Sequence, residues 1–181
     1  TLKKLYPDSE YLRALALSAG KIMRTNFLLG MEKEWKSNNT PITETDTKID
    51  DLICKTVKND FPEVYIIGEE SGRIMQNMDY TLVFDPVDGT IPFSSGVPIS
   101  TFCACVLKEG ELYSAVIYDP FVNRMWHASR DSGSFLNQKR ITVSQKKELA
   151  RTVISANFHY DRFNEIYKKL ASEGAILMTA C

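Results

Sequence analysis

The sequence predicts an α+β fold followed by the start of an α/β unit, and three patterns carry this prediction. Three strand-like runs joined by short turns lie between residues 100 and 128, which is typical of an antiparallel meander. Two stretches with apolar residues at helical spacing precede the meander. A final strand–helix–strand pattern indicates a parallel α/β unit. We place the domain boundary near 144–150, so the predicted domains are 1–147 and 148–181.

Both helices of the first domain have recognisable starts. The first is predicted over 8–29, after the start signal Pro7-Asp8. The second begins after Thr43, which can cap it, and Asp46 lies in its first turn, where the helix dipole favours a negative charge.

The remaining elements follow from alternation and turn residues. A strand is predicted over 80–84, and Pro86 is expected to end it because proline has no N–H for a sheet. The segment 91–98 is predicted to be a turn or a short helical piece. Further strands are predicted over 32–36, 64–67, 100–107, 112–118, 124–128, 134–136, 141–143, 152–156 and 175–178, a helix over 161–173, and loops over 37–41 and 68–72.

Composition narrows the class of protein. Lys and Arg number 22 against 23 Asp and Glu, for a net charge of -1, so neither nucleic acid nor an anionic membrane is indicated as a partner. The apolar runs are shorter than a membrane span and no signal peptide is recognisable, so we expect a cytoplasmic protein. Since the sequence stops directly after an apolar run, we expect it to be a piece of a longer chain.

The four cysteines and two histidines give little support to thiol or histidine catalysis. Cys103 and Cys105 share one face of a predicted strand and are interpreted as small buried apolar residues, with a Cys-x-Cys metal site as the alternative. His127 lies within a strand pattern and is interpreted as structural. His159 is the other histidine.

The stretch with the clearest chemistry is Asp85-Pro86-Val87-Asp88-Gly89-Thr90. Its two carboxylates lie at a predicted strand end and can point at one ion, and carboxylate oxygens suit Mg2+. Gly89 permits a tight turn, after which the amides of Gly89 and Thr90 can face a phosphate. The alternative is a surface turn in which aspartate caps and glycine bends the chain.

Two more acidic groups lie at the ends of predicted elements. Asp46 begins a helix, where an ordinary first-turn acid is the alternative interpretation. Glu69 and Glu70 follow a short apolar strand between glycines, where a solvated turn is the alternative. Acidic residues at three element ends favour a common site.

Together these motifs resemble the inositol monophosphatase superfamily of Mg2+-dependent, lithium-sensitive phosphatases. The resemblance is carried by Ile67-Gly68-Glu69-Glu70-Ser71 and by residues 85–90 at the matching interval. Thr43-Glu44-Thr45-Asp46, Lys36-Ser37, the Gly-Val-Pro-Ile-Ser run and Tyr118-Asp119-Pro120 also fit. It implies a layered αβαβα fold, of which this chain would hold mainly the N-terminal half, two helices packed on an antiparallel sheet.

The resemblance implies a set of metal ligands. Glu69, Asp85 and the backbone carbonyl of Val87 would hold a first Mg2+. Asp85 would bridge to a second ion that Asp88 also binds, which suits two ions that share one carboxylate. Glu70 would serve a further, weaker ion.

The resemblance also implies catalytic and substrate-binding roles. Thr90, hydrogen-bonded towards Asp46, would orient and help to deprotonate the attacking water, and the Gly89 and Thr90 amides would bind the phosphate. The chain departs from the family pattern at Pro92, where asparagine is usual, and this removes a polar side chain and an N–H. It also lacks the downstream Trp-Asp-x-Ala-Ala-Gly-like motif that supplies another aspartate.

The expected function is Mg2+-dependent hydrolysis of a small phosphate monoester, most similar to inositol monophosphate, by a metal-activated water. Histidinol phosphate, fructose 1,6-bisphosphate and 3'-phosphoadenosine 5'-phosphate are alternative substrates. A non-catalytic relative that binds metal or phosphate is the alternative from another class. The expected partner is a small phosphorylated metabolite, with a homodimer implied by the resemblance.

Overall fold

The computed structural model describes residues 5–27, 34–35, 41–74, 79–155 and 160–178. The chain divides into two compact units, Thr1–Ile141 and Thr142–Cys181, whereas the predicted boundary lay between residues 147 and 148. The Lys36-Ser37 motif and His159 lie outside the described residues.

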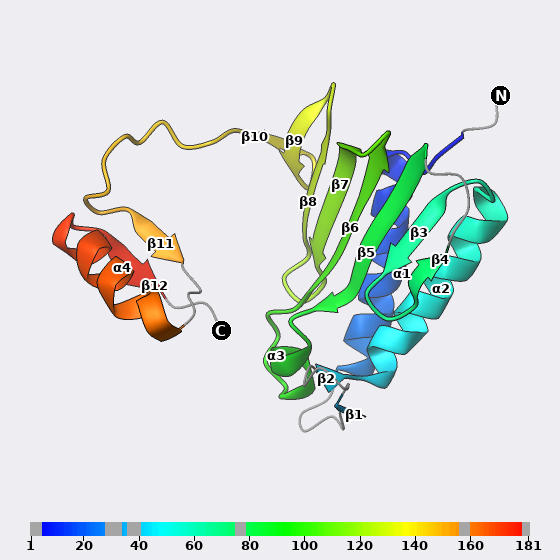
Figure 1. The fold of residues 1–181 in the computed structure, drawn as a ribbon, viewed down its shortest axis with the longest axis horizontal. Helices are drawn as coiled ribbons and strands as arrows, with labels where there is room; N and C mark the ends of the chain where they lie inside the picture. Colours follow the sequence, from blue (N-terminus) through cyan, green and yellow to red (C-terminus); the bar gives the residue numbers. More distant parts are fainter. Residues whose placement is uncertain (1–4, 28–33, 36–40, 75–78, 156–159, 179–181) are drawn as a thin grey trace. The chain divides into compact units, whose positions relative to one another are not determined.

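The first unit contains helices and strands in mixed order (Figure 1). Its helices are α1 (Ser9–Asn26), α2 (Glu44–Asp60) and α3 (Thr90–Ser94). Its strands are β1 (Glu34–Trp35), β2 (Pro41–Ile42), β3 (Tyr65–Gly68), β4 (Gly72–Ile74), β5 (Tyr80–Asp88), β6 (Thr101–Lys108), β7 (Glu111–Asp119), β8 (Arg124–Ser129), β9 (Gly133–Leu136) and β10 (Lys139–Ile141).

One eight-stranded sheet organises the first unit, in the order β10-β9-β8-β7-β6-β5-β3-β4. Neighbouring strands from β5 to β10 are antiparallel, which confirms the predicted meander. The strands β3 and β5 are parallel, so the sheet predicted as antiparallel is mixed at this point. Because parallel strands end at the same edge of a sheet, this pair brings two of the acidic motifs together.

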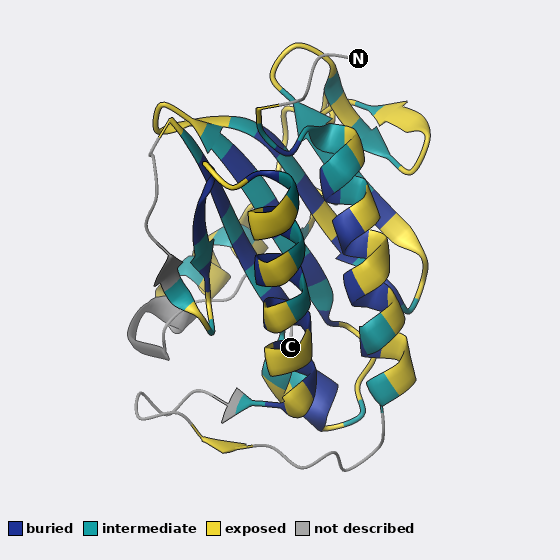
Figure 2. Cartoon of the chain, turned by 90° about the vertical axis from the view of Figure 1, so that its right-hand side faces the viewer, coloured by how far each residue is buried: buried dark blue, intermediate teal, exposed yellow. Residues whose placement is uncertain are grey.

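Both long helices cover one face of this sheet, and their buried sides face the strands (Figure 2). The α1 helix begins at Asp8, whose carboxylate accepts a hydrogen bond from the Tyr11 amide at 3.0 Å. Apolar residues spaced three and four apart fill the layer between helices and sheet, because that spacing makes one face of a helix. They include Leu12, Ala16, Met23, Ile49, Ile53 and Val57, all fully buried. The two predicted helices packed on a sheet are therefore confirmed.

Pro86 does not end β5, contrary to the prediction. The strand continues to Asp88, and its register against β6 shifts between Asp85 and Asp88. A β-bulge leaves a residue outside the regular ladder, so the missing proline N–H is tolerated there. The bulge turns the end of β5 at the acidic motif.

Two short strands were also missed. The strand β2 includes Pro41, which had been assigned to a loop, and pairs with β1. The strand β4 begins at Gly72, at the end of a predicted turn, and pairs antiparallel with β3. Each has three residues or fewer, which is too short to show alternation.

The second unit contains β11 (Val153–Ser155), α4 (Tyr160–Ser172) and β12 (Ile176–Met178). The two strands are parallel, with Ile154 opposite Leu177. The predicted strand–helix–strand unit is therefore present. Among the described residues, no helix is both long enough and apolar enough to cross a membrane.

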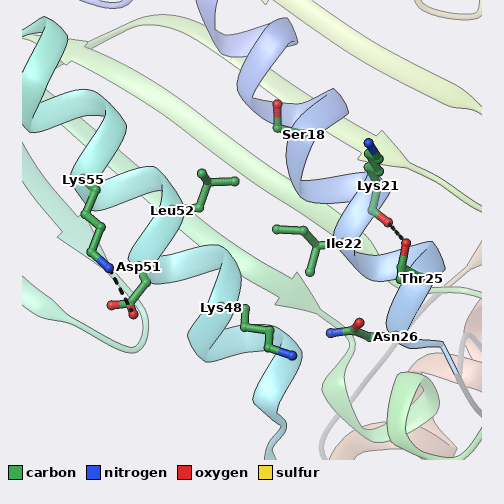
Figure 3. Close-up of a pocket in the computed structure, with 9 residues that line it drawn as sticks. All are labelled: Ser18, Lys21, Ile22, Thr25, Asn26, Lys48, Asp51, Leu52 and Lys55. Carbon is green, nitrogen blue, oxygen red and sulfur yellow. Dashed lines mark hydrogen bonds and ion pairs between the residues drawn. The ribbon is translucent and has the colours of Figure 1, made fainter.

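A groove of about 730 Å³ lies between α1 and α2 on their outer side (Figure 3). Its lining includes Ile22 and Leu52 and three lysines, of which Lys55 pairs with Asp51 at 3.7 Å. None of the acidic motif residues lines this groove, so it is separate from the candidate site described next.

Candidate active site

The start of α2 fixes Asp46 in the interior. Asp46 is 1% exposed, and its carboxylate accepts hydrogen bonds from the Thr43 amide at 2.8 Å and from the Thr43 hydroxyl at 2.5 Å. The Thr43 side chain in turn accepts from the Asp46 amide, and this reciprocal arrangement is a capping box, which confirms Thr43 as the helix cap. Burial raises the pKa of Asp46, and the hydrogen bonds from Thr43 partly offset the rise because they favour the charged form.

Thr90 connects the start of α2 to the end of β5. Its hydroxyl lies 3.1 Å from the Val87 carbonyl oxygen and 3.4 Å from Oδ1 of Asp46. One proton cannot serve both acceptors fully, and the shorter distance favours the carbonyl. The structure therefore brings Thr90 close to Asp46, as the resemblance implied, and also to the Val87 carbonyl.

The chain turns sharply between β5 and α3 at Gly89. Its φ of 90° lies in the left-handed region, which costs glycine little. The buried Ser100 hydroxyl donates to the Gly89 carbonyl at 2.7 Å. Pro92 lies in the first turn of α3, where a helix does not need the backbone N–H. Proline therefore fits the local backbone at this departure from the family pattern.

Parallel pairing places Glu69 beside Asp85. Gly68 lies opposite Phe84 in the ladder, so Glu69, the first residue after β3, lies next to Asp85, while β5 itself continues to Asp88. The Glu69 amide donates to the Phe84 carbonyl at 3.2 Å, which ties the turn to β5. The carboxyl groups of Glu69 and Asp85 lie within hydrogen-bonding reach of each other.

Asp85 lies close to two other acidic side chains, Glu69 and Asp88. Burial raises its pKa to about 7, together with repulsion from Glu69 and Asp88 and a hydrogen bond with Glu69. The Val87 amide donates to Asp85 Oδ1 at 3.0 Å and acts in the opposite direction. Near neutral pH this carboxyl therefore carries its full charge only when something compensates for that charge.

Asp88 is exposed and points towards β6. Its Oδ2 lies 3.5 Å from the Thr101 hydroxyl and 3.8 Å from the Cys103 sulfur, because Thr101 and Cys103 face this part of β5 in the sheet. Burial raises the pKa of Cys103 to about 11, so the thiol stays protonated. Cys103 and Cys105 are only partly buried, which corrects the prediction that they are buried.

The donor atoms of this cluster fit a hard divalent cation. Glu69, Asp85, Asp88 and the Val87 carbonyl offer oxygen, the ligand that Mg2+ prefers. A cation would also relieve the repulsion that raises the pKa of Asp85. Within the described part of the chain, no three acidic, cysteine or histidine side chains are gathered closely enough to form a ready metal site. Side chains would therefore have to move to share an ion.

The structure shows two supporting residues that sequence reasoning missed. Ser100 holds Gly89, and Asp50, only 5% exposed, accepts a hydrogen bond from the Ser71 amide at 3.2 Å. These two contacts join residues that are 11 and 21 positions apart in the chain. The one local feature that could have indicated Asp50 is its position four residues after Asp46, on the same helix face. His127, as predicted, has structural contacts, with Nε2 2.8 Å from the Asn137 carbonyl and its ring stacked on Phe135.

The sequence profile of the inositol monophosphatase family matches residues 6–177. The chain belongs to the inositol monophosphatase family. Its fold agrees, since the Thermotoga maritima IMPase superimposes with a TM-score of 0.86 over 94% of this chain and 66% of that chain, at 24% identity. The suhB protein of Bartonella henselae superimposes with a TM-score of 0.83 over 93% of this chain and 67% of that chain, at 23% identity. These two likenesses establish the fold alone.

Similar family members carry two different names. The Nus factor SuhB of Xylella fastidiosa is 31% identical over 167 residues, which cover 91% of this chain and 60% of that protein. The inositol monophosphatase of Dictyostelium discoideum is 33% identical over 132 residues, which cover 71% of this chain and 48% of that protein. The chain thus spans about half to three fifths of the length of these family members.

Proposed function

We propose that this chain belongs to an Mg2+-dependent phosphatase that hydrolyses a small phosphate monoester, most similar to inositol monophosphate. The observation that carries the proposal is the meeting of Glu69, Asp85 and the Asp46–Thr90 pair at one edge of the sheet. Family membership and the Dictyostelium relative named inositol monophosphatase support it. Cytoplasmic location, a homodimer and the absence of nucleic-acid and membrane partners stay predictions.

In this proposal Glu69, Asp85 and the Val87 carbonyl would hold one Mg2+, and Asp85 and Asp88 would hold a second. When bound, the ions would supply positive charge that neutralises the phosphate dianion and lowers the pKa of a water. The carboxylates bring the negative charge that attracts the ions, and the bulge after Asp85 lets two of them come from one strand.

Asp46 and Thr90 handle the proton of the attacking water. When the Thr90 hydroxyl donates to Asp46 Oδ1, its oxygen lone pairs can accept a hydrogen bond from water. The water proton then passes towards Asp46, whose raised pKa makes it a better base than an ordinary aspartate. The amides of Gly89 and Thr90 bind the phosphate oxygens.

A second candidate is a relative that binds metal or phosphate without catalysis. It is favoured by the several similar proteins named Nus factor SuhB and by Pro92 in place of asparagine. The Asp46–Thr90 contact argues against it, because binding alone does not need a group that accepts a proton from water.

Phosphate release distinguishes the two candidates. Inositol monophosphate, histidinol phosphate, fructose 1,6-bisphosphate and 3'-phosphoadenosine 5'-phosphate would be offered with and without Mg2+. The proteins would be the 181-residue chain and a version extended through the downstream aspartate motif. Mg2+-dependent release by either form supports the phosphatase, and inhibition by millimolar lithium would place it with the lithium-sensitive members. If both forms fold but release no phosphate, the result would support the binding role.

A further inference from the structure

The helix α2 carries two buried carboxylates on one face, and the proposed function uses one of them. Asp46 and Asp50 are four residues apart and are 1% and 5% exposed. Residues at this spacing lie one above the other on a helix. Burying a carboxylate costs free energy unless hydrogen bonds compensate, so Asp50 needs hydrogen-bond partners in the interior.

Both carboxylate oxygens of Asp50 have partners, one in the β3–β4 turn and one on α2. Oδ1 accepts a hydrogen bond from the Ser71 amide at 3.2 Å. Oδ2 lies 3.6 Å from the Cys54 sulfur, which is also 3.5 Å from the Ser71 hydroxyl. Asp50, Cys54 and Ser71 therefore form a closed set of contacts that holds the end of the turn against α2.

Gly68 lets this turn approach the carboxylate closely. A Cβ at Gly68 would lie 2.6 Å from Asp50 Oδ1, 2.5 Å from the Ser71 hydroxyl and 2.9 Å from Cζ of Phe84. Carbon atoms do not approach oxygen that closely without displacement, so a side chain at Gly68 would push the turn and Asp50 apart. The space a side chain would need is filled by Ser71, Asp50 and Phe84.

Glu69 lies between the two points at which the turn is fixed. On one side its own amide donates to Phe84, and on the other Ser71 donates to Asp50. Glu69 is exposed, and the two backbone hydrogen bonds limit where its side chain can lie next to Asp85.

We infer that Asp50 is a positioning residue: through Ser71 and Gly68 it fixes the turn that presents Glu69 to Asp85, and so sets the affinity of this site for Mg2+. The inference rests on the proposed function, in which Glu69 is a ligand. Residues that orient metal ligands typically change metal affinity about 10- to 100-fold when they are removed.

The test measures Mg2+ binding by calorimetry and amide hydrogen exchange without Mg2+, in the same protein. We expect Asp50→Ala to weaken Mg2+ binding about 10-fold or more and to speed exchange of the Ser71 amide, but not of Val106 in the central strand β6. Asp50→Asn keeps an oxygen acceptor for Ser71 and should restore most of the affinity. Asp51→Ala makes the same change of charge at the adjacent exposed position and should leave both readouts unchanged.

Each contrary result has a distinct meaning. Asp50→Ala with the affinity of the parent protein would overturn the inference while the proposed function stands. A lower number of sites per chain at unchanged affinity would show a purely structural role and also overturn it. A parent protein that binds no Mg2+, or a Glu69→Gln variant that binds as tightly as the parent, would overturn the proposed function and the inference with it.

Gly68→Ala provides a second variant if Asp50→Ala does not fold. It disturbs the same contact from the other side and leaves Asp50 in place. We expect weaker Mg2+ binding and faster Ser71 exchange, as for Asp50→Ala. Unchanged values for both would overturn the inference.

Discussion

Asp85 shows how the surroundings of one residue can determine its chemistry. An aspartate ordinarily titrates near 3.8, but burial and the neighbouring carboxylates raise the pKa of Asp85 to about 7. Between these values the folded protein holds a proton that the unfolded chain has released. Proton binding by the folded state therefore stabilises it at low pH, and this contribution is lost as the pH rises towards 7.

The first prediction is a pH dependence of stability without divalent ions. The free energy of unfolding should decrease from about pH 4 to about pH 7, and Asp85→Asn should flatten this decrease. Urea denaturation at several pH values in EDTA measures it. Added Mg2+ should stabilise the protein more at pH 8 than at pH 5. An Asp85→Asn variant with the parent slope would assign the dependence to another group.

The second prediction concerns Asp88, which is exposed and contributes to the repulsion on Asp85. In the form of the protein that shows Mg2+-dependent turnover, Asp88→Asn should abolish that turnover with little loss of stability. Phosphate release and the thermal midpoint measure the two effects. Asp131→Asn, at an exposed position between β8 and β9, is the control. Unchanged turnover in Asp88→Asn would remove Asp88 from the metal site.

At the scale of elements, the packing of α1 on β7 depends on a glycine. Gly20 is buried in the middle of α1, where glycine weakens a helix by about 1 kcal/mol relative to alanine. The ring of Tyr118 occupies the space next to it, and a Cβ would overlap Cε1 of that ring and lie 3.0 Å from Cβ of Pro120. The Tyr118 hydroxyl donates to Asn123 at 3.0 Å, which limits how far the ring can move.

The third prediction is that Gly20→Ala destabilises the protein although alanine favours helices. Overpacking of this kind costs about 1–3 kcal/mol, which exceeds the gain in helix propensity. The free energy of unfolding in urea measures the result. Ser18→Ala, at an exposed position on the same helix, should be close to neutral. A more stable Gly20→Ala variant would show that Tyr118 can shift at low cost.

At the scale of the whole molecule, the chain forms two compact units, each with its own internal contacts. The core of the first unit lies between the helices and one face of the sheet, and residues from α1, α2 and the central strands fill it. Its stability should therefore depend on side chains that reach this layer rather than on the hydrophobicity of a helix as a whole.

The fourth prediction compares two leucines of α1. Leu12 is fully buried, whereas Leu17 is 51% exposed. Leu12→Ala should lower the free energy of unfolding by about 2–5 kcal/mol, because it removes buried surface and leaves a cavity. Leu17→Ala should change it by no more than about 0.5 kcal/mol. Similar losses for both variants would mean that Leu17 also packs against part of the protein.

Local sequence was enough to predict the long elements and to select several residues of the candidate site. Helical spacing located α1 and α2, alternation located the strands of the meander, and Thr43 was recognised as a cap. The acidic motifs were found because they lie where the apolar patterns stop. These features depend on residues close together in the chain, so the sequence by itself determined them.

The tertiary structure alone decided how the motifs meet. The parallel pairing of β3 with β5 places Glu69 at Asp85, and the bulge carries β5 past Pro86. The buried contacts of Asp50, and Cys103 beside Asp88, likewise join residues from different elements. Strand pairing, burial and the resulting pKa of Asp85 arise from contacts between segments far apart in the chain, and no local pattern records which segments will be neighbours.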